Sequence, residues 1–255
     1  MPERFDLTGR RALVTGSSRG IGRAIALALA EHGAAVAFHC VSREAEAREA
    51  MAQVVGSGGR ASVVRGDIAR EGGSRLVAEA AASDLGGSLD IVVANASIEI
   101  RQPWEDSAWE TGRRQFEANM LGALELIQAT APAMVERGWG RVVTIGSVQQ
   151  VRPHPQLVVY AALKSALVNM VRNLALQLSR TGVTVNNLAP GAILTDRNAG
   201  VLSDPKYREW AESRIPMGFV GEPADCSGAA LLLCSDAGRY ITGTDLFVDG
   251  GMHLG

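Results

Sequence analysis

The feature that most constrains the fold is a regular alternation of short apolar segments with longer segments of helical periodicity. Seven short segments are rich in aliphatic and β-branched residues, at 11–15, 34–40, 61–65, 89–94, 141–145, 183–188 and 245–248. Between them, segments such as 20–32, 43–55 and 70–85 repeat apolar residues at helical spacing. Apolar strands joined by helices form right-handed crossovers and a parallel sheet that helices cover on both faces. The pattern therefore predicts one doubly wound α/β domain over residues 1–255, with a mostly parallel seven-stranded sheet.

The composition predicts an aliphatic core and argues against several classes of partner. Of the 255 residues, 47% are hydrophobic and 5% aromatic, and the net charge is −2. A chain of this size buries roughly three-quarters of its unfolded surface, so its folding needs neither disulfides nor metal. Mixed, nearly balanced charge argues against nucleic acid or an anionic membrane as a partner. No apolar run reaches the ~20 residues of a spanning helix, and the first residues lack the apolar region of a signal peptide.

The cysteines and histidines indicate a reducing compartment and no metal site. Cys40, Cys226 and Cys234 show no CxxC spacing, and the four histidines are scattered along the chain. An odd number of such cysteines fits a reducing cytoplasm, where each is a small buried apolar residue. A zinc site would need clustered His or Cys ligands. We therefore expect a cytoplasmic protein without a bound metal.

A glycine-rich loop connects the first strand to the following helix, with the spacing Gly16-x-x-x-Gly20-x-Gly22. Gly16 permits a tight turn, and the other two glycines let the backbone approach a pyrophosphate. The helix N-terminus then offers free N–H groups and the positive end of its dipole to phosphate. An ordinary glycine-rich turn is the alternative, but the strand before and the helix after favour a dinucleotide-binding loop. The expected contacts come from Gly16, Ser18, Arg19, Gly20, Ile21 and Gly22.

The end of the second strand indicates which dinucleotide binds. A carboxylate there would bind the ribose 2′-hydroxyl and repel a 2′-phosphate, yet residues 36–43 contain no Asp or Glu. Arg19 and Arg43 could bind a 2′-phosphate through charge-assisted hydrogen bonds, and Ser42 adds a hydroxyl. Alternatively, Arg43 only covers the exposed start of the next helix. The sequence favours NADP and leaves NAD as the alternative.

A hydroxyl, a phenol and an ammonium group follow in the second half of the chain. Tyr160 and Lys164 are four residues apart in a segment of helical periodicity, so their side chains share one helix face. A nearby ammonium group favours the phenolate and lowers the tyrosine pKa, so the phenol can exchange a proton with an alcohol or carbonyl. Ser147, at the end of the fifth strand, can bind the same oxygen. Taken singly, Tyr-x-x-x-Lys is common on amphipathic helices and Ser147 could be an ordinary loop hydroxyl.

In this order and at these spacings, the glycine loop, Ser147 and Tyr160-x-x-x-Lys164 resemble the short-chain dehydrogenase/reductase family over nearly the whole chain. The resemblance implies a Rossmann-type domain and hydride transfer between a nicotinamide and a carbonyl or secondary-alcohol carbon. Tyr160 is then the general acid/base, Ser147 binds the reacting oxygen, and Lys164 shifts the tyrosine pKa and binds ribose. Asn119, in the predicted helix 109–134, matches the family position that holds a proton-relaying water. As a lone asparagine within a helix, it could also simply hydrogen-bond to backbone.

The same resemblance implies further cofactor contacts at the ends of three strands. Asp67 matches the family position that holds the adenine ring, although an Asp there could equally cap the start of a helix. Asn95-Ala96-Ser97 stands where the family has Asn-Ala-Gly, so Ser97 would be strained if that backbone needs a positive φ. The cofactor contacts implied at these strand ends are Asp67, Ile68, Asn95, Ala96, Pro190, Gly191, Ile193 and Thr195.

The sequence leaves the substrate open. Expected pocket residues are Glu99, Gln149, Gln150, Arg152 and His154, together with residues 193–217, which we expect to form a mobile lid that includes Trp210 and Met217. These polar groups would suit a sugar or polyol, while the family resemblance is equally compatible with a 3-oxoacyl thioester or another ketone. A catalytically idle NADP-binding sensor is the alternative function.

Our expectation about the oligomeric state is based on two long helices. The predicted helix 109–134 has an apolar stripe, and the Tyr160 helix has another. In the family these helices pair between subunits, usually in a homotetramer, although they could simply cover the sheet. We expect a homotetramer, with a dimer as the alternative.

Overall fold

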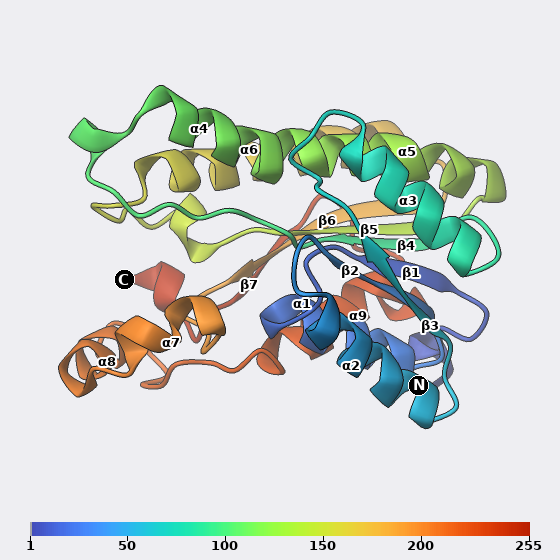
Figure 1. Ribbon diagram of the computed structural model, residues 1–255, viewed down its shortest axis with the longest axis horizontal. Helices are drawn as coiled ribbons and strands as arrows, with labels where there is room; N and C mark the ends of the chain where they lie inside the picture. The colour runs from blue at the N-terminus through green and yellow to red at the C-terminus, as the bar shows by residue number, and fades with distance from the viewer. Residues whose placement is uncertain (1) are drawn as a thin grey trace.

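A seven-stranded sheet in which every strand pair is parallel organises the molecule (Figure 1). The computed structural model describes residues 2–255. The strands follow the order β3-β2-β1-β4-β5-β6-β7. Their bounds are β1 Arg11–Val14, β2 Ala35–Cys40, β3 Ala61–Arg65, β4 Ile91–Ala94, β5 Gly140–Ile145, β6 Val183–Pro190 and β7 Asp245–Val248. The predicted doubly wound α/β fold is confirmed.

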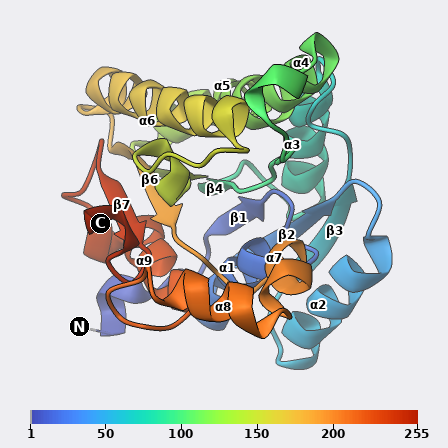
Figure 2. The same ribbon diagram turned by 90° about the vertical axis from the view of Figure 1, so that its left-hand side faces the viewer.

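Helices cover both faces of this sheet, as Figures 1 and 2 show. α1, α2 and α9 pack on one face, and α3, α5 and α6 pack on the other. The helices are α1 Gly20–Glu31, α2 Glu44–Gly56, α3 Gly73–Asp84, α4 Trp109–Phe116, α5 Gly122–Arg137, α6 Val158–Leu178, α7 Asp196–Leu202, α8 Pro205–Glu212 and α9 Asp225–Cys234. This arrangement follows from the parallel strands. The chain must cross over from the end of one strand to the start of the next, and helices usually form such crossovers.

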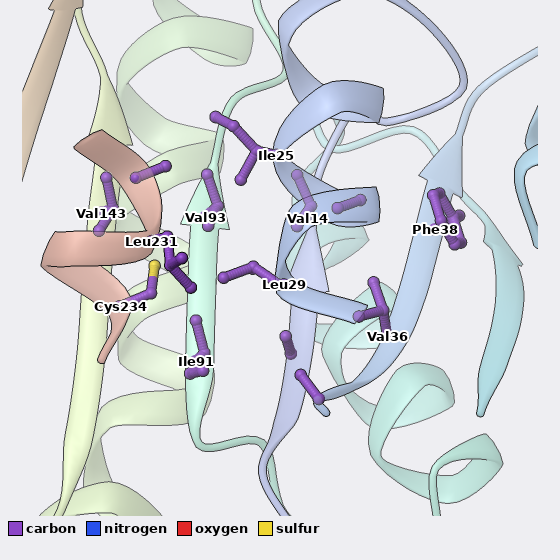
Figure 3. Packing of buried hydrophobic residues seen from close by; sticks show 14 of the residues in the cluster. Val14, Ile25, Leu29, Val36, Phe38, Ile91, Val93, Val143, Leu231 and Cys234 are labelled. Carbon is purple, nitrogen blue, oxygen red and sulfur yellow. The ribbon is translucent and has the colours of Figure 1, made fainter. Parts of the chain in front are cut away.

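Side chains of successive strand residues lie alternately in two cores, one on each face of the sheet. In β1, the side chain of Val14 lies in the core beneath α1 and α9, while that of Leu13 lies in the core beneath α3, α5 and α6. Figure 3 shows the first of these cores, with Leu29 of α1 packed among strand residues. Each fully buried Leu, Ile or Val contributes roughly 1.5–3 kcal/mol relative to exposure. The aliphatic composition therefore suffices to hold both helix layers on the sheet.

The strand order reverses between β1 and β4, which are neighbours in the sheet. The chain runs outward through β2 and β3, then returns to the centre and builds β4 to β7 on the other side. The loops after β1 and β4 therefore leave in different directions and open a crevice between them. Open α/β sheets bind their ligands at such a switch point, outside the carboxyl ends of the strands.

Two expected helices differ in their details. The helix expected at 70–85 begins only at Gly73, because a turn at 67–72 precedes it and Gly72 has a φ of 76°. The helix expected at 109–134 continues to Arg137 but contains a π-helical turn, Glu117–Leu121, between α4 and α5. Such π turns often occur at functional sites, and this one contains Asn119.

The segment between β6 and α9 forms a separate helical excursion beside the sheet ends. It holds α7 and α8 (Figure 2), and its own apolar cluster consists of Leu202, Ala211, Ile215 and Val220. An isolated bridge between Ile193 and Gly221 closes the base of this excursion. We call residues 193–217 the lid segment from here on.

Residues 2–255 lack two kinds of feature, a membrane-spanning helix and a metal-binding cluster. No helix in this part of the chain is both long and apolar enough to cross a membrane. Within the same residues, no three His, Cys, Asp or Glu side chains gather closely enough to hold a metal ion.

Candidate active site

A cavity of about 350 Å³ lies at the carboxyl ends of the central strands, at the switch point. We call it the cofactor cavity. It brings together most of the dinucleotide and proton-transfer residues predicted from the sequence. These are Gly16, Ser18, Arg19, Gly20, Ile21, Gly22, Ser42, Arg43, Asn95, Ala96, Ser147, Tyr160, Lys164, Pro190, Gly191 and Thr195.

The glycine loop has the geometry that its spacing predicts. Gly16 and Gly20 have φ values of +64° and +57°, in the left-handed region that favours glycine. A Cβ on Gly22 would collide with the Asn95 amide and the Gly16 carbonyl. Asn95 Nδ2 donates to the carbonyls of Thr15 and Gly16, at 2.8 and 3.1 Å. The loop therefore presents bare backbone at a helix N-terminus, which suits a pyrophosphate.

His39 holds this loop from below and was not predicted from the sequence. Its Nδ1 accepts a hydrogen bond from the Gly16 backbone N–H, and its Nε2 donates to the Gly66 carbonyl, both at 3.0 Å. Burial lowers the pKa of His39, so the neutral ring can keep both bonds. The only sequence signal was a polar residue within the apolar strand 34–40. His39 ties the glycine loop to the loop after β3.

Arg19, Ser42 and Arg43 lie together on the wall of the cofactor cavity. Arg19 pairs with Asp196 at 2.8 Å, and Arg43 pairs with Glu46 at 2.9 Å. All four side chains are substantially exposed, so these ion pairs contribute little to stability and can exchange for another anion. No carboxylate at the end of β2 lines the cavity, so this wall fits a 2′-phosphate.

Tyr160 and Lys164 lie one helical turn apart on α6 and are almost fully buried, at 5% and 3% exposure. Lys164 Nζ donates to the Ile145 carbonyl at 2.6 Å and lies 5.5 Å from the centroid of the Tyr160 ring. Burial lowers the pKa of Lys164 to about 7. Burial also raises the pKa of Tyr160, against the opposing effects of Arg197 and Ser147. This direction is opposite to the one expected from the lysine alone, because burial disfavours the charged form of both groups.

A short 3₁₀ turn after β5 fixes Ser147. Its Oγ accepts a hydrogen bond from the Gln149 backbone N–H at 3.2 Å, and its own N–H donates to Gln150 Oε1 at 3.3 Å. Gln150 also donates to Asp245 and accepts from Asn187. Gln150 therefore supports this turn from the side of β7 and does not line the substrate pocket, contrary to the sequence-based expectation.

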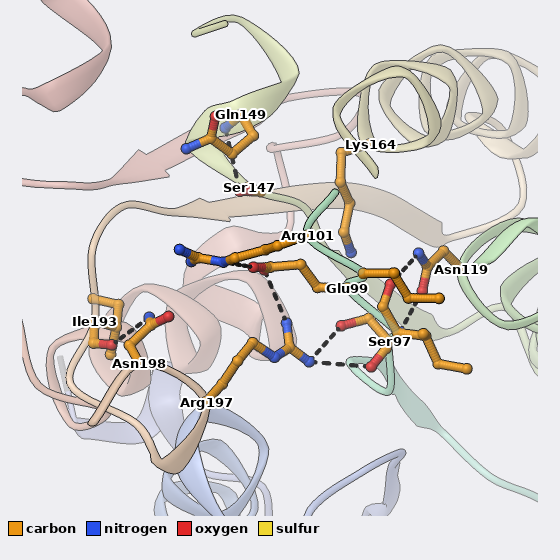
Figure 4. A network of polar contacts seen from close by, with 12 residues as sticks. Ser97, Glu99, Arg101, Asn119, Ser147, Gln149, Lys164, Ile193, Arg197 and Asn198 are labelled. Atoms are coloured by element: carbon orange, nitrogen blue, oxygen red, sulfur yellow. Dashed lines mark hydrogen bonds and ion pairs between the residues drawn. The ribbon is translucent and has the colours of Figure 1, made fainter. Parts of the chain in front are cut away.

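An ion-paired chain of three side chains crosses the mouth of the cofactor cavity (Figure 4). Glu99 lies 2.8 Å from Arg101 and 3.6 Å from Arg197, and its own side chain is only 10% exposed. Arg197, from the lid segment, also donates to the carbonyl and the hydroxyl of Ser97, at 3.1 and 3.2 Å. Ser97 is not strained, because every residue with positive φ within 2–255 is a glycine. Arg197 was not singled out from the sequence, since its partners lie about 100 residues earlier.

Four predicted site residues lie outside the lining of the cofactor cavity. Asp67 accepts a hydrogen bond from the Ala69 N–H at 3.0 Å and lies 3.6 Å from Arg70. Since α3 begins only at Gly73, Asp67 does not cap that helix, and its contact with the adenine ring remains a prediction. Ile68 and Ile193 are buried in the two cores. Asn119 binds Ile98 with both ends of its amide, each at 2.8 Å, so its side chain positions the loop after β4. Its expected role in holding a water remains a prediction.

A second cavity, of about 330 Å³, adjoins the first on the side of the lid segment. We call it the outer cavity. Three of the residues expected around the substrate line it, namely Gln149, Arg152 and His154, and so does Trp210 of the lid segment. Glu99 instead lines the cofactor cavity, and Met217 faces a different hollow beside β7. Arg101 lines the outer cavity as well and was not predicted to do so.

Comparisons with known proteins match this chain to reductases and dehydrogenases. Residues 16–253 match the family model described as enoyl-(acyl carrier protein) reductase. The chain is 37% identical over 250 residues to 3β-hydroxysteroid dehydrogenase 1 of Eggerthella lenta, covering 98% of this chain and 95% of that protein. It is similar to a crystal structure of gluconate 5-dehydrogenase from Burkholderia cenocepacia in complex with NADP and tartrate, with a TM-score of 0.93, 33% identity and coverage of 100% and 99%. A 3-oxoacyl-(acyl-carrier-protein) reductase from Agrobacterium tumefaciens with NADP bound gives a TM-score of 0.93, 37% identity and coverage of 98% and 96%.

Proposed function

Because this chain belongs to the short-chain dehydrogenase/reductase family, we propose that it is an NADP-dependent oxidoreductase. It transfers a hydride between the nicotinamide ring and a carbonyl or secondary-alcohol carbon. The observation that carries the proposal is that Ser147, Tyr160 and Lys164 line the same cavity as the glycine loop. A dinucleotide site and a proton donor are thereby joined in one crevice. The catalytically idle sensor is not favoured, since it would not need these three groups together.

The dinucleotide supplies the hydride when bound, and the protein supplies position and the proton. In the reducing direction, Tyr160 donates its phenolic proton to the substrate oxygen. Its raised pKa keeps the phenol protonated at neutral pH, which suits this role as general acid. Ser147 donates a hydrogen bond to the same oxygen. Lys164 lies beside the tyrosine ring, and its pKa of about 7 lets it exchange a proton near neutral pH.

NADP is the proposed dinucleotide, with NAD as a weaker alternative substrate. Arg19 and Arg43 supply guanidinium groups, which bind phosphate through charge-assisted hydrogen bonds. Both guanidinium groups would exchange their carboxylate partners for the 2′-phosphate. The two structural relatives described above hold NADP, which agrees with this assignment.

The lid segment, residues 193–217, is proposed to close over both cavities when ligands bind. Arg197 and Asp196 attach it to the loop after β4 and to the glycine loop, respectively. Arg19, Asp196 and Arg197 are half-exposed, whereas Glu99 is only 10% exposed, and we propose that these bonds are remade as the segment moves. We propose that the whole chain acts as one oxidoreductase domain, with this segment as its moving part.

We also propose a homotetramer located in the cytoplasm. Exposed apolar side chains gather on α4, the π turn and α6, including Trp109, Phe116, Leu121 and Leu176. Such side chains are typical of surfaces that a partner subunit covers. The three cysteines are buried and unpaired in the described chain, which agrees with a reducing compartment. Light scattering after gel filtration distinguishes a tetramer from a dimer.

The decisive experiment compares the wild-type protein with Tyr160→Phe. NADPH and NADH are screened with aldehydes, ketones and 3-oxoacyl thioesters, and NADP and NAD with sugars, polyols and sugar acids. Turnover should fall by at least about a hundredfold in the variant, because the proton donor is lost. Binding of the dinucleotide, measured by calorimetry, should remain within about twofold, because Tyr160→Phe keeps the ring.

Each failure has a distinct meaning. Tight dinucleotide binding with no turnover across the panel would support the alternative that the protein is an NADP-binding sensor. Absence of dinucleotide binding would contradict the whole proposed function. Turnover that survives in Tyr160→Phe would reassign the proton donor.

A further inference from the structure

The outer cavity lies next to the cofactor cavity. Their linings come from adjacent positions on the chain. Ser147 lines the cofactor cavity, and Gln149, two residues later, lines the outer cavity. Likewise, Arg197 lines the cofactor cavity, and its neighbour Asn198 lines the outer cavity (Figure 4). A substrate whose reacting carbon meets Ser147 and Tyr160 therefore has the rest of its body in the outer cavity.

The lining of this outer cavity is cationic. It contains Arg101, Arg152 and Arg214 and no Asp or Glu. Glu99 neutralises Arg101 at 2.8 Å. Within residues 2–255, neither Arg152 nor Arg214 has a carboxylate oxygen within 4.0 Å, since no ion pair involves them.

The contacts of these two arginines leave donors free. Arg152 uses one terminal nitrogen to bind two backbone carbonyls, those of Arg214 and Met252. The Arg214 guanidinium lies 5.2 Å from the Trp210 ring centroid. A guanidinium group has five N–H donors, so each can still bind an oxyanion in two-point geometry.

The cavity also carries neutral polar side chains that can meet hydroxyls, namely Gln149 and His154. His154 Nδ1 accepts a hydrogen bond from the Gln156 backbone N–H at 3.2 Å. The proton of the neutral ring is therefore on Nε2, which is a donor.

We propose that the outer cavity binds the anionic, hydroxylated end of the substrate. A carboxylate or phosphate is held by Arg152 and Arg214, and a hydroxyl accepts a hydrogen bond from His154 Nε2. The inference rests on the proposed function and narrows its substrate class to small hydroxy or oxo compounds that carry an oxyanion. A purely apolar ketone would leave both arginines without a counter-charge, and such unpaired polar groups strongly reject a ligand that cannot satisfy them.

The test uses three compounds that differ only at C1: D-gluconate with a carboxylate, sorbitol 1-phosphate with a phosphate ester, and sorbitol with a hydroxyl. NADP reduction is measured for the wild-type protein, Arg214→Met and Arg214→Lys. At least one anion should exceed sorbitol in kcat/KM by about tenfold. Arg214→Met should lose about tenfold for that anion, mainly in KM, and less than about twofold for sorbitol. Arg214→Lys should recover part of the loss, because it restores the charge.

Arg208→Met is the matched control. Arg208 lies on the same lid segment but pairs with Glu212 and does not line the outer cavity. Its substitution should leave the preference for anions unchanged. An equal loss in both variants would mean that the lid, and not the charge at Arg214, sets the preference, which would overturn the proposal.

A binding measurement separates this proposal from the proposed function. Calorimetry with the Tyr160→Phe variant and saturating NADP reports binding of gluconate, sorbitol 1-phosphate and sorbitol without turnover. Binding of either anion at least about tenfold more tightly than sorbitol supports the inference even if no substrate is turned over. Equal or weaker binding of both anions overturns it, whether or not the protein proves to be an oxidoreductase. The difference between gluconate and sorbitol 1-phosphate identifies carboxylate or phosphate as the preferred group.

Discussion

The cofactor cavity and the outer cavity lie side by side but are built in different ways. The first is formed by strand ends, a glycine loop and buried polar groups such as His39 and Lys164, whose hydrogen bonds go to backbone. The second is formed by loops and the lid segment, and its charged or aromatic groups are more exposed, with Trp210 at 47%. One cavity is fixed by the sheet, whereas the other depends on side chains that can rearrange.

This difference has a general consequence for function. Backbone donors on a rigid sheet can recognise one invariant ligand, such as a dinucleotide, with little reorganisation. Side chains on loops and on the lid segment lie outside the two cores of the sheet, so they can be substituted without disturbing those cores and can suit different substrates. Substitutions in the cofactor cavity should therefore change binding or catalysis for every substrate. Those in the outer cavity should change only which substrate is preferred.

The largest expected effect is that of Lys164→Met in the cofactor cavity. Activity should fall by about a hundredfold or more for every substrate, because the group beside the proton donor is lost. The apo protein should nevertheless become more stable near pH 7, because the variant no longer buries an ammonium group. Turnover assays together with urea unfolding measure both effects.

The stability gain should depend on pH with a defined sign. Burial lowers the pKa of Lys164 from 10.5 to about 7, so between these values the unfolded chain binds the proton and the folded protein does not. The free energy of unfolding of the wild type therefore rises with pH across this window, at up to about 1.4 kcal/mol per pH unit. The advantage of Lys164→Met is largest at pH 7 and below and shrinks toward pH 10. A constant difference from pH 6 to 9 would contradict the lowered pKa.

Two glycine substitutions, one in the cofactor cavity and one in the lid segment, test this contrast directly. Gly22→Ala should raise the NADP Kd by roughly tenfold or more, because the new Cβ displaces Asn95 or the Gly16 carbonyl. Gly200→Ala, in α7 of the lid segment, meets no atom within 4 Å and has a helical backbone. It should leave NADP binding unchanged and stabilise the protein by about 0.5–1 kcal/mol. Calorimetry and thermal unfolding check both, and equal losses of NADP binding would contradict the contrast.

The smallest expected effect lies where the two regions touch. Asp196→Asn removes the carboxylate that pairs with Arg19. NADPH should then bind about two- to fivefold more tightly, as expected for an exposed ion pair, while NADH binding stays unchanged. Fluorescence titration measures both nucleotides, and Glu49→Gln, which unpairs Arg23 outside the cavity, is the control. An equal gain for NADH would show that the pair acts on the loop and not on the 2′-phosphate.

Local signals allowed much of the fold and the cofactor cavity to be predicted from the sequence. The strands follow from short apolar runs, and the glycine loop and the Tyr160–Lys164 pair each depend on residues a few positions apart. Asp196 and Arg197 could not be found in this way, because their partners lie 177 and about 100 residues away. Gln150 was misplaced for the same reason, since its contact with Asp245 spans 95 residues.

Two further properties of the site depend on competition between alternative partners. Asp67 can serve a turn or a ligand, and in the structure its carboxylate accepts the Ala69 N–H. The pKa of Tyr160 depends on burial as well as on neighbouring charge, and burial is the larger effect. Neither balance can be read from spacing, because both depend on how deeply the folded chain covers the group.

The π turn at 117–121 holds one residue more than an α-helical turn, because its hydrogen bonds run to the fifth residue along the chain and not to the fourth. The wide turn takes up this extra residue, so the helix that follows keeps the rotational phase of an uninterrupted α-helix. In that phase, Leu126, Ile127 and Met134 face the sheet from α5. Removing one residue from the turn would therefore leave α5 packed on the sheet, but it would move Asn119, whose amide binds the backbone of Ile98. The extra residue thus serves the loop after β4 and not the core.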